Sequence, residues 1–125
     1  MADMADARPP LWTGHVFLYS ADLMGLAHFY EKVGMRTVAV FEHLAAMEMR
    51  GGTHLVIRHD PSQVAPGPVP WDLMVDDIDA THDKWRAEGL LVTDIVTESP
   101  HRVFQLTDPE GHVVVVRDSH VVGAV

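Results

Sequence analysis

The fold is decided by one stretch, Asp108-Pro109-Glu110-Gly111-His112-Val113-Val114-Val115-Val116-Arg117-Asp118, in which a tight turn leads directly into a strand. Asp-Pro favours a turn, the following glycine allows a sharp change of direction, and four consecutive valines predict a buried strand. An earlier stretch, 51–60 (GGTHLVIRHD), has the same order of glycine, polar residue, apolar run, arginine and acid. Because both stretches share this order, we predict that the chain contains two copies of one structural module.

The rest of each half supports this repeat. In the first half a β-rich segment, 15–20, precedes Asp22 and a helical pattern that ends at Gly34; in the second, 71–75 precedes Asp77 and a helical pattern that ends at Gly89. The number of residues between the aspartate and the glycine is the same in both halves. We therefore predict two βαβββ modules, with further strands at 35–43, 46–50 and 53–58 in the first.

The predicted organisation is one domain with two short extensions. We expect a flexible leader at 1–11, a single domain at 12–118 and a tail at 119–125. Within the domain, module one covers 12–60 and module two covers 71–118. The segment 61–70 between them is rich in proline, a composition that disfavours helices and strands, and is predicted to be a linker.

Composition excludes several classes of function. The formal net charge of −9 opposes binding to nucleic acid and favours a cationic or neutral ligand. No apolar run approaches the roughly 20 residues that a membrane span needs. The chain has no cysteine, so disulfides, thiolate metal sites and cysteine nucleophiles are excluded. The leader lacks the basic start and apolar centre of a signal peptide, which predicts a cytoplasmic protein.

The paired modules, the run FYEKVGM at 29–35 and the turn at 108–112 resemble the vicinal oxygen chelate superfamily, which includes glyoxalases, bleomycin-resistance proteins and extradiol dioxygenases. The resemblance extends over about residues 12–118. It implies an α+β fold in which the curved sheets of two βαβββ modules form an open cup, with the helices packed outside. It also implies a homodimer and a ligand or substrate that is a small molecule.

The resemblance further implies a divalent metal held by up to four side chains, but this sequence departs from that pattern. The first ligand position falls on His15, which could bind a metal. The other three fall on Val56, Pro70 and Val115, whose side chains cannot bind one. We therefore predict that the standard metal site of the superfamily is absent.

Strand alternation predicts which side chains face the cup. We predict His15 as a catalytic residue, although a strand-end histidine bonded to the backbone is an equally simple interpretation. His15, His54 and Asp72 form a possible displaced metal site of the two-histidine, one-carboxylate type. The predicted ligand-binding residues are Phe17, Tyr19, His54, Arg58, Asp72, Met74, Phe104, Val115 and Arg117.

These observations favour a small-molecule-binding protein of the glyoxalase and bleomycin-resistance type, without the standard metal site and therefore with no cofactor. The alternative is a lyase, isomerase or dioxygenase that depends on one divalent metal bound by the displaced site. A metal-free enzyme with His15 as its base and a module that mediates protein contacts are two further hypotheses.

Overall fold

The computed structural model describes residues 7–121 and 123–125. Within that part of the chain, the structure has β-strands (β), α-helices (α) and short 3-10 helices (η). The elements are β1 (His15–Ser20), α1 (Leu23–Val33), β2 (Arg36–Val40), β3 (Leu44–Glu48), η1 (Arg50–Gly52), β4 (His54–His59), η2 (Pro61–Gln63), β5 (Gly67–Val75), α2 (Ile78–Ala87), β6 (Leu91–Val92), β7 (Val96–Glu98), β8 (His101–Thr107) and β9 (His112–Asp118).

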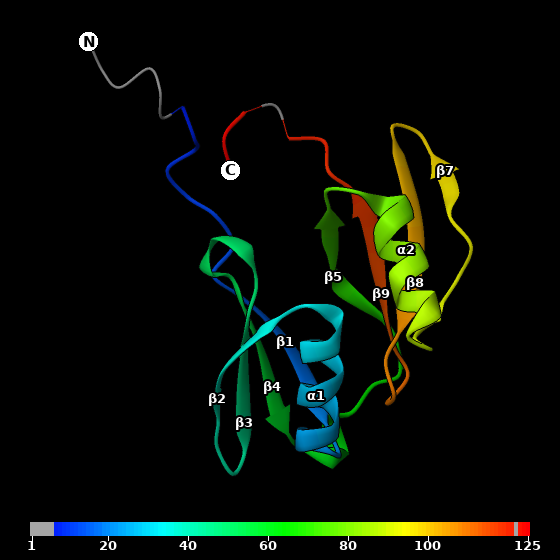
Figure 1. Cartoon of the computed structure of the whole chain (residues 1–125). Coiled ribbons are helices and arrows are strands. Elements are labelled where there is room, and N and C mark those ends of the chain that lie inside the picture. The colour runs from blue at the N-terminus through cyan, green and yellow to red at the C-terminus, as the bar shows by residue number, and fades with distance from the viewer. Residues whose placement is uncertain (1–6, 122) are drawn as a thin grey trace.

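The two halves have the same topology, which confirms the predicted α+β fold of two βαβββ modules. The first sheet has the strand order β1-β4-β3-β2, and the second has the order β5-β9-β8-β6, with β7 paired to β8. In each module the first and last strands are parallel neighbours, and the other pairs are antiparallel. Each helix covers the sheet of its own module, and the sheets do not close into a barrel (Figure 1).

The helices begin where the sequence predicts them. The side chain of Asp22 accepts a hydrogen bond from the backbone N–H of Gly25 (3.1 Å), and that of Asp77 accepts one from Ala80 (3.0 Å). Both aspartates therefore act as helix N-caps, because they satisfy amides that have no partner within the helix.

Two apolar clusters form the core between helices and sheets. The first gathers around Leu26 and Tyr30 of α1 with Leu55 and Ile57 of β4, and the second lies beneath α2. Phe29 and Val33 of α1 pack against both clusters. The two apolar clusters therefore meet beside α1.

A buried polar network of Tyr30, Asp108, His112, Ser20 and Glu110, the inter-module network, also joins the modules. The Asp108 carboxylate accepts hydrogen bonds from the Tyr30 hydroxyl (2.9 Å) and from the backbone N–H groups of Glu110 (2.9 Å) and His112 (3.0 Å), and lies 2.7 Å from His112 Nδ1. Glu110 in turn accepts from the Ser20 hydroxyl. The turn that opens β9 therefore fixes α1 and the end of β1 to module two.

The first strand of module two differs from its predicted extent. It begins at Gly67 and not at Trp71, so it includes Pro68 and Pro70. Proline is tolerated in β5 because, among the described residues, this strand pairs with β9 alone and is an edge strand. Its register against β9 shifts between Pro68 and Asp72, as expected where a ladder loses N–H donors.

Neither helix in the described residues is long and apolar enough to cross a membrane.

Candidate functional site

The candidate site is the concave side of the two sheets, which faces away from the helices. On β1 the alternation is clear, because Leu18 belongs to the first apolar cluster while Phe17 and Tyr19 are 53% and 40% exposed. On β5, Met74 is 51% exposed, whereas Leu73 packs against both clusters. The predicted facing of Phe17, Tyr19 and Met74 therefore agrees with their exposure.

Phe104 lies on the other side of its sheet. Its side chain is 1% exposed and contacts the rings of Trp85 and His82 in the core beneath α2. Because neighbours on a strand point to opposite faces, the concave position belongs to Gln105, which pairs with Val115. The ring of Phe104 therefore packs in the core beneath α2, and its role in ligand binding stays a prediction.

A row of polar side chains crosses the concave side of the first sheet. Arg36, Glu48, His54 and His15 occupy directly opposed positions on β2, β3, β4 and β1. The Arg36 guanidinium bonds to Glu48 and lowers the pKa of that carboxyl, and His54 Nε2 lies 3.3 Å from Glu48 Oε2. The ring of His15 stacks on that of His54, with centroids 5.7 Å apart. Sequence reasoning missed Glu48, because only the strand register places it beside His54.

The structure brings together two of the three residues of the possible displaced metal site, which are His15, His54 and Asp72. His15 and His54 are neighbours, but Asp72 Oδ2 accepts a hydrogen bond from Arg117 Nε (2.9 Å) on the second sheet. Among the residues that the structure describes, no group of three or more His, Asp or Glu side chains could hold a metal ion. The metal and catalytic roles of His15 stay predictions.

The residues present also do not fit the metal site that the resemblance implies. Val56 and Val115 lie on the concave side, since their neighbours Ile57 and Val116 belong to the two cores. A valine at either position offers no lone pair to a metal.

A cavity of about 370 Å³, the β7–β9 cavity, opens on the concave side of the second sheet. Three residues that were predicted to bind ligand line it: Phe104, Val115 and Arg117. Sequence reasoning missed six further lining residues: Thr93, Asp94, Val96, Glu98, Val103 and Gln105. Most of these lie on or beside the short segment between β6 and β8, whose path no residue periodicity predicts.

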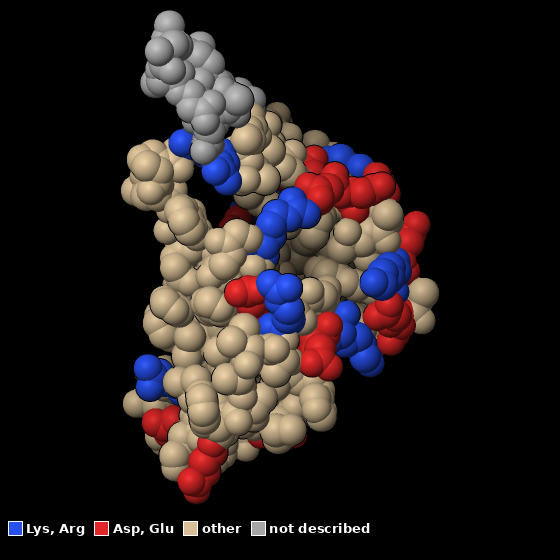
Figure 2. All heavy atoms as spheres, turned by 60° about the vertical axis from the view of Figure 1, so that its left-hand side comes forward, with Lys and Arg blue, Asp and Glu red and all other residues tan. Residues whose placement is uncertain are grey.

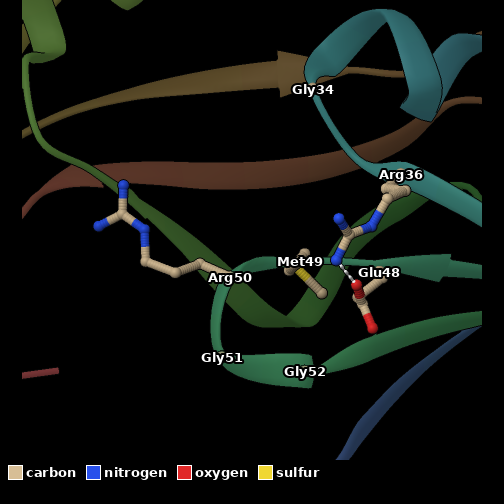
Figure 3. A pocket seen from close by; sticks show the side chains of 7 residues that line it. All are labelled: Gly34, Arg36, Glu48, Met49, Arg50, Gly51 and Gly52. Carbon is tan, nitrogen blue, oxygen red and sulfur yellow. Dashed lines mark hydrogen bonds and ion pairs between the residues drawn. The ribbon is translucent and has the colours of Figure 1, made fainter.

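A second cavity, of about 420 Å³, lies at the β3–β4 turn and is lined by Arg36, Glu48, Arg50 and three glycines (Figure 3). Both of its arginines already bond to an acidic side chain. Arg36 points to Glu48, and Arg50 extends away from the cavity, where it bonds to Asp76 of module two. Neither guanidinium in this cavity is therefore free to bind a ligand.

Charges on the face shown in Figure 2 are interspersed, with basic side chains beside acidic ones. Arg58, predicted to bind ligand, is exposed on β4 opposite Tyr19 of β1. The pairing places Arg58 and Tyr19 on neighbouring strands of the concave side, one residue before the end of each strand.

Comparison with known proteins agrees with this geometry. A family model described as a glyoxalase-like domain matches residues 15–117. The chain belongs to this family. The match confirms the resemblance to the vicinal oxygen chelate superfamily, and this glyoxalase-like chain has the open two-module fold expected of it. No curated protein sequence matches the chain.

Solved structures share the fold of this glyoxalase-like chain at low sequence identity. A lactoylglutathione lyase from Agrobacterium tumefaciens superposes with a TM-score of 0.74 at 20% identity, covering 90% of this chain and 96% of the lyase. TnmS3, an antibiotic-binding protein from Streptomyces sp. CB03234, gives 0.75 at 21% identity, with 88% and 97% covered. A bleomycin-binding protein in complex with bleomycin gives 0.68 at 18% identity, with 87% and 98% covered. At these identities the likeness establishes the fold alone.

Proposed function

We propose that this glyoxalase-like chain binds a small organic molecule on its concave side, without the standard metal of the superfamily, and does so as a homodimer. One observation carries the proposal. Val56 and Val115 lie on the concave side at positions where the superfamily places metal ligands. The chain therefore has the fold of the superfamily but lacks the side chains that usually bind its metal ion.

The character of the concave side supports binding. Phe17, Tyr19 and Met74 expose apolar surface there, and Arg58, Asp72 and Arg117 add a few polar groups among them. A concave surface that combines exposed apolar side chains with placed polar groups is typical of small-molecule sites. Two of the structural neighbours, TnmS3 and the bleomycin-binding protein, are described as binding antibiotics or bleomycin, which supports the same function here.

A fragment screen by NMR tests the proposal. The ¹⁵N-labelled protein is mixed with neutral and cationic aromatic fragments, and the amide shifts are mapped on the chain. We expect the shifts to concentrate in 15–19, 54–58 and 113–117. Phe17→Ala should weaken fragment binding by about tenfold, because it removes a half-exposed ring from the concave side. Met24→Ala, which trims an equally exposed residue on the helix side, is the matched control. Shifts confined to the helix side, or absent, would refute the proposal.

Metal analysis separates binding from the metal-dependent alternative. Protein purified without chelators should contain well below one metal ion per chain, and His15→Ala, His54→Ala and Asp72→Ala should leave that content unchanged. A stoichiometric metal that is lost in these variants would replace the proposal with the lyase, isomerase or dioxygenase hypothesis.

The homodimer has its own support. Among the described residues, the edge strand β2 pairs with β3 alone, and its Val38 and Val40 are 54% and 40% exposed. Sedimentation at micromolar concentration should give about twice the chain mass of 13.9 kDa, whereas a monomer would contradict this part of the proposal. The cytoplasmic location stays a prediction.

A further inference from the structure

Arg117 presents an unused hydrogen-bonding fork to the β7–β9 cavity. Asp72 Oδ2 accepts from Nε of this guanidinium at 2.9 Å, and this is the one ion pair that the described residues give to Arg117. The two terminal Nη atoms are therefore free of protein partners in the described chain. Two adjacent Nη groups form the planar end of a guanidinium that binds a carboxylate through two parallel hydrogen bonds. Asp72 acts as a positioning residue, since it fixes the guanidinium from its other side.

The acidic side chains of the cavity are not equivalent. Asp94 bonds to Arg86 (2.9 Å), and that guanidinium lowers the pKa of the Asp94 carboxyl. Glu98 is exposed on β7, and its carboxylate has no ion pair or hydrogen bond within residues 7–121 and 123–125. Arg117 and Asp72 neutralise each other, as do Arg86 and Asp94. The cavity is thus left with one uncompensated negative charge, at Glu98.

The strand register places an apolar floor between these two groups. Val96 of β7, Val103 of β8 and Arg117 of β9 form one cross-strand row, and Glu98 lies two residues along β7. Ideal strand spacings put the Cα atoms of Glu98 and Arg117 roughly 12 Å apart. Val103 is buried at 4% exposure and Val96 is half exposed, so the surface between the charges is apolar. Beside it, Gln105 presents an exposed amide from the position opposite Val115.

We propose that the β7–β9 cavity binds a zwitterionic small molecule that carries a carboxylate and an amine on an apolar body. The carboxylate bonds to the free Nη atoms of Arg117, the ammonium pairs with Glu98, and the body lies on Val96 and Val103. The inference rests on the proposed function and narrows its ligand class. A simple anion is disfavoured by the net charge at Glu98, and a simple cation leaves the Arg117 fork without a partner.

Three matched probes test this assignment, namely 4-(aminomethyl)benzoate, benzylamine and benzoate. They share one benzene ring and differ in which charges they carry. Dissociation constants are measured by titration, following the Nε–Hε cross-peak of Arg117 and the backbone amides of 96–98 in the ¹⁵N-labelled protein. We expect 4-(aminomethyl)benzoate to bind about tenfold more tightly than benzylamine, and benzoate to bind most weakly, because each charged hydrogen bond in a half-exposed site is worth about one factor of ten.

Variants identify the two recognition groups. The double variant Asp72→Asn with Arg117→Gln keeps the net charge and should remove the advantage of 4-(aminomethyl)benzoate over benzylamine. Glu98→Gln should remove the advantage of 4-(aminomethyl)benzoate over benzoate. Glu88→Gln, which deletes one carboxylate at the end of α2, should change neither ratio. All of these side chains are at least partly exposed, so folding should be unaffected.

The inference is overturned if 4-(aminomethyl)benzoate binds no better than benzylamine, if its advantage survives the double variant, or if none of the three probes shifts the Arg117 cross-peak. Those results leave the proposed function standing where other fragments still perturb 15–19 or 54–58. Failure of the whole fragment screen on the concave side would instead refute the proposed function itself.

Discussion

Removing one hydroxyl from the inter-module network should destabilise the whole domain. The Tyr30 side chain is fully buried, and its hydroxyl donates to the Asp108 carboxylate at 2.9 Å. Burial, together with the charge of Asp108, raises the pKa of Tyr30, so the phenol keeps its proton and remains a donor at every accessible pH. Tyr30→Phe conserves the ring and its packing. It therefore isolates the single hydrogen bond that α1 makes to the turn before β9.

The expected magnitude follows from what Asp108 retains. A hydrogen bond to a charged group contributes about 1.5–3 kcal/mol, and the carboxylate still has His112 and two backbone N–H donors after the change. We expect the free energy of unfolding to fall by about 2 kcal/mol. With a urea m-value of about 2 kcal/mol/M for a domain of this size, the midpoint should fall by about 1 M with an unchanged slope.

Urea unfolding followed by circular dichroism measures this loss. Tyr19→Phe is the matched control, because the same hydroxyl is removed from a ring that is 40% exposed on the concave side. The control should change the free energy of unfolding by less than about 0.5 kcal/mol. If Tyr30→Phe were as mild as the control, the inter-module network would not carry the docking of the two modules. A loss of the same size in both variants would equally contradict the reasoning.

Further changes test the core, a turn and the response to acid. Phe104→Ala should lower the free energy of unfolding by about 3–5 kcal/mol and Met74→Ala by less than about 1, since the Phe104 ring is buried and the Met74 side chain is half exposed; equal losses would contradict the packing of Phe104 in the core. Gly52→Ala should cost about 1–2 kcal/mol, because φ is +86° there, whereas Gly14→Ala, at a residue with an ordinary φ, should be nearly neutral; a neutral Gly52→Ala would contradict the turn. A backbone N–H bond lowers the pKa of Asp118 below its usual 3.8, so its contribution to stability is present above about pH 4 and is lost as the pH falls through the folded pKa. Urea midpoints measured from pH 6 to pH 3 should therefore show a gap between the wild type and Asp118→Asn that narrows on acidification, and a constant gap would contradict this.

Much of the fold could be predicted from local chemistry. Asp22 and Asp77 precede helical patterns and cap the helices, because the first amides of any helix need acceptors. The repeat of a glycine turn and an apolar strand fixed the topology of both modules. The start of β5 could not be predicted, since Pro68 and Pro70 disfavour a strand unless it lies at an edge, and edge position is not visible in sequence.

The candidate site was predicted less completely. Period-two alternation placed Phe17 and Tyr19 on the concave side, and the superfamily pattern made Val115 informative, because a valine cannot replace a metal ligand. The burial of the Phe104 ring was not predicted, because Phe104 was placed near the cup by its aromatic character and not by alternation. Glu98 was missed because the path of β7 depends on its pairing with β8.

By itself, then, the sequence determined the modules, the helix caps and the absence of the usual metal ligands, since each depends on a side chain and its nearest neighbours along the chain. Only the tertiary structure decided that Arg117 is held by Asp72 from another strand, that Glu98 has no counter-ion among the described residues, and that Glu48 joins Arg36 to His54. These contacts connect residues far apart in sequence. Strand register brings them together, and register follows from the packing of the whole sheet.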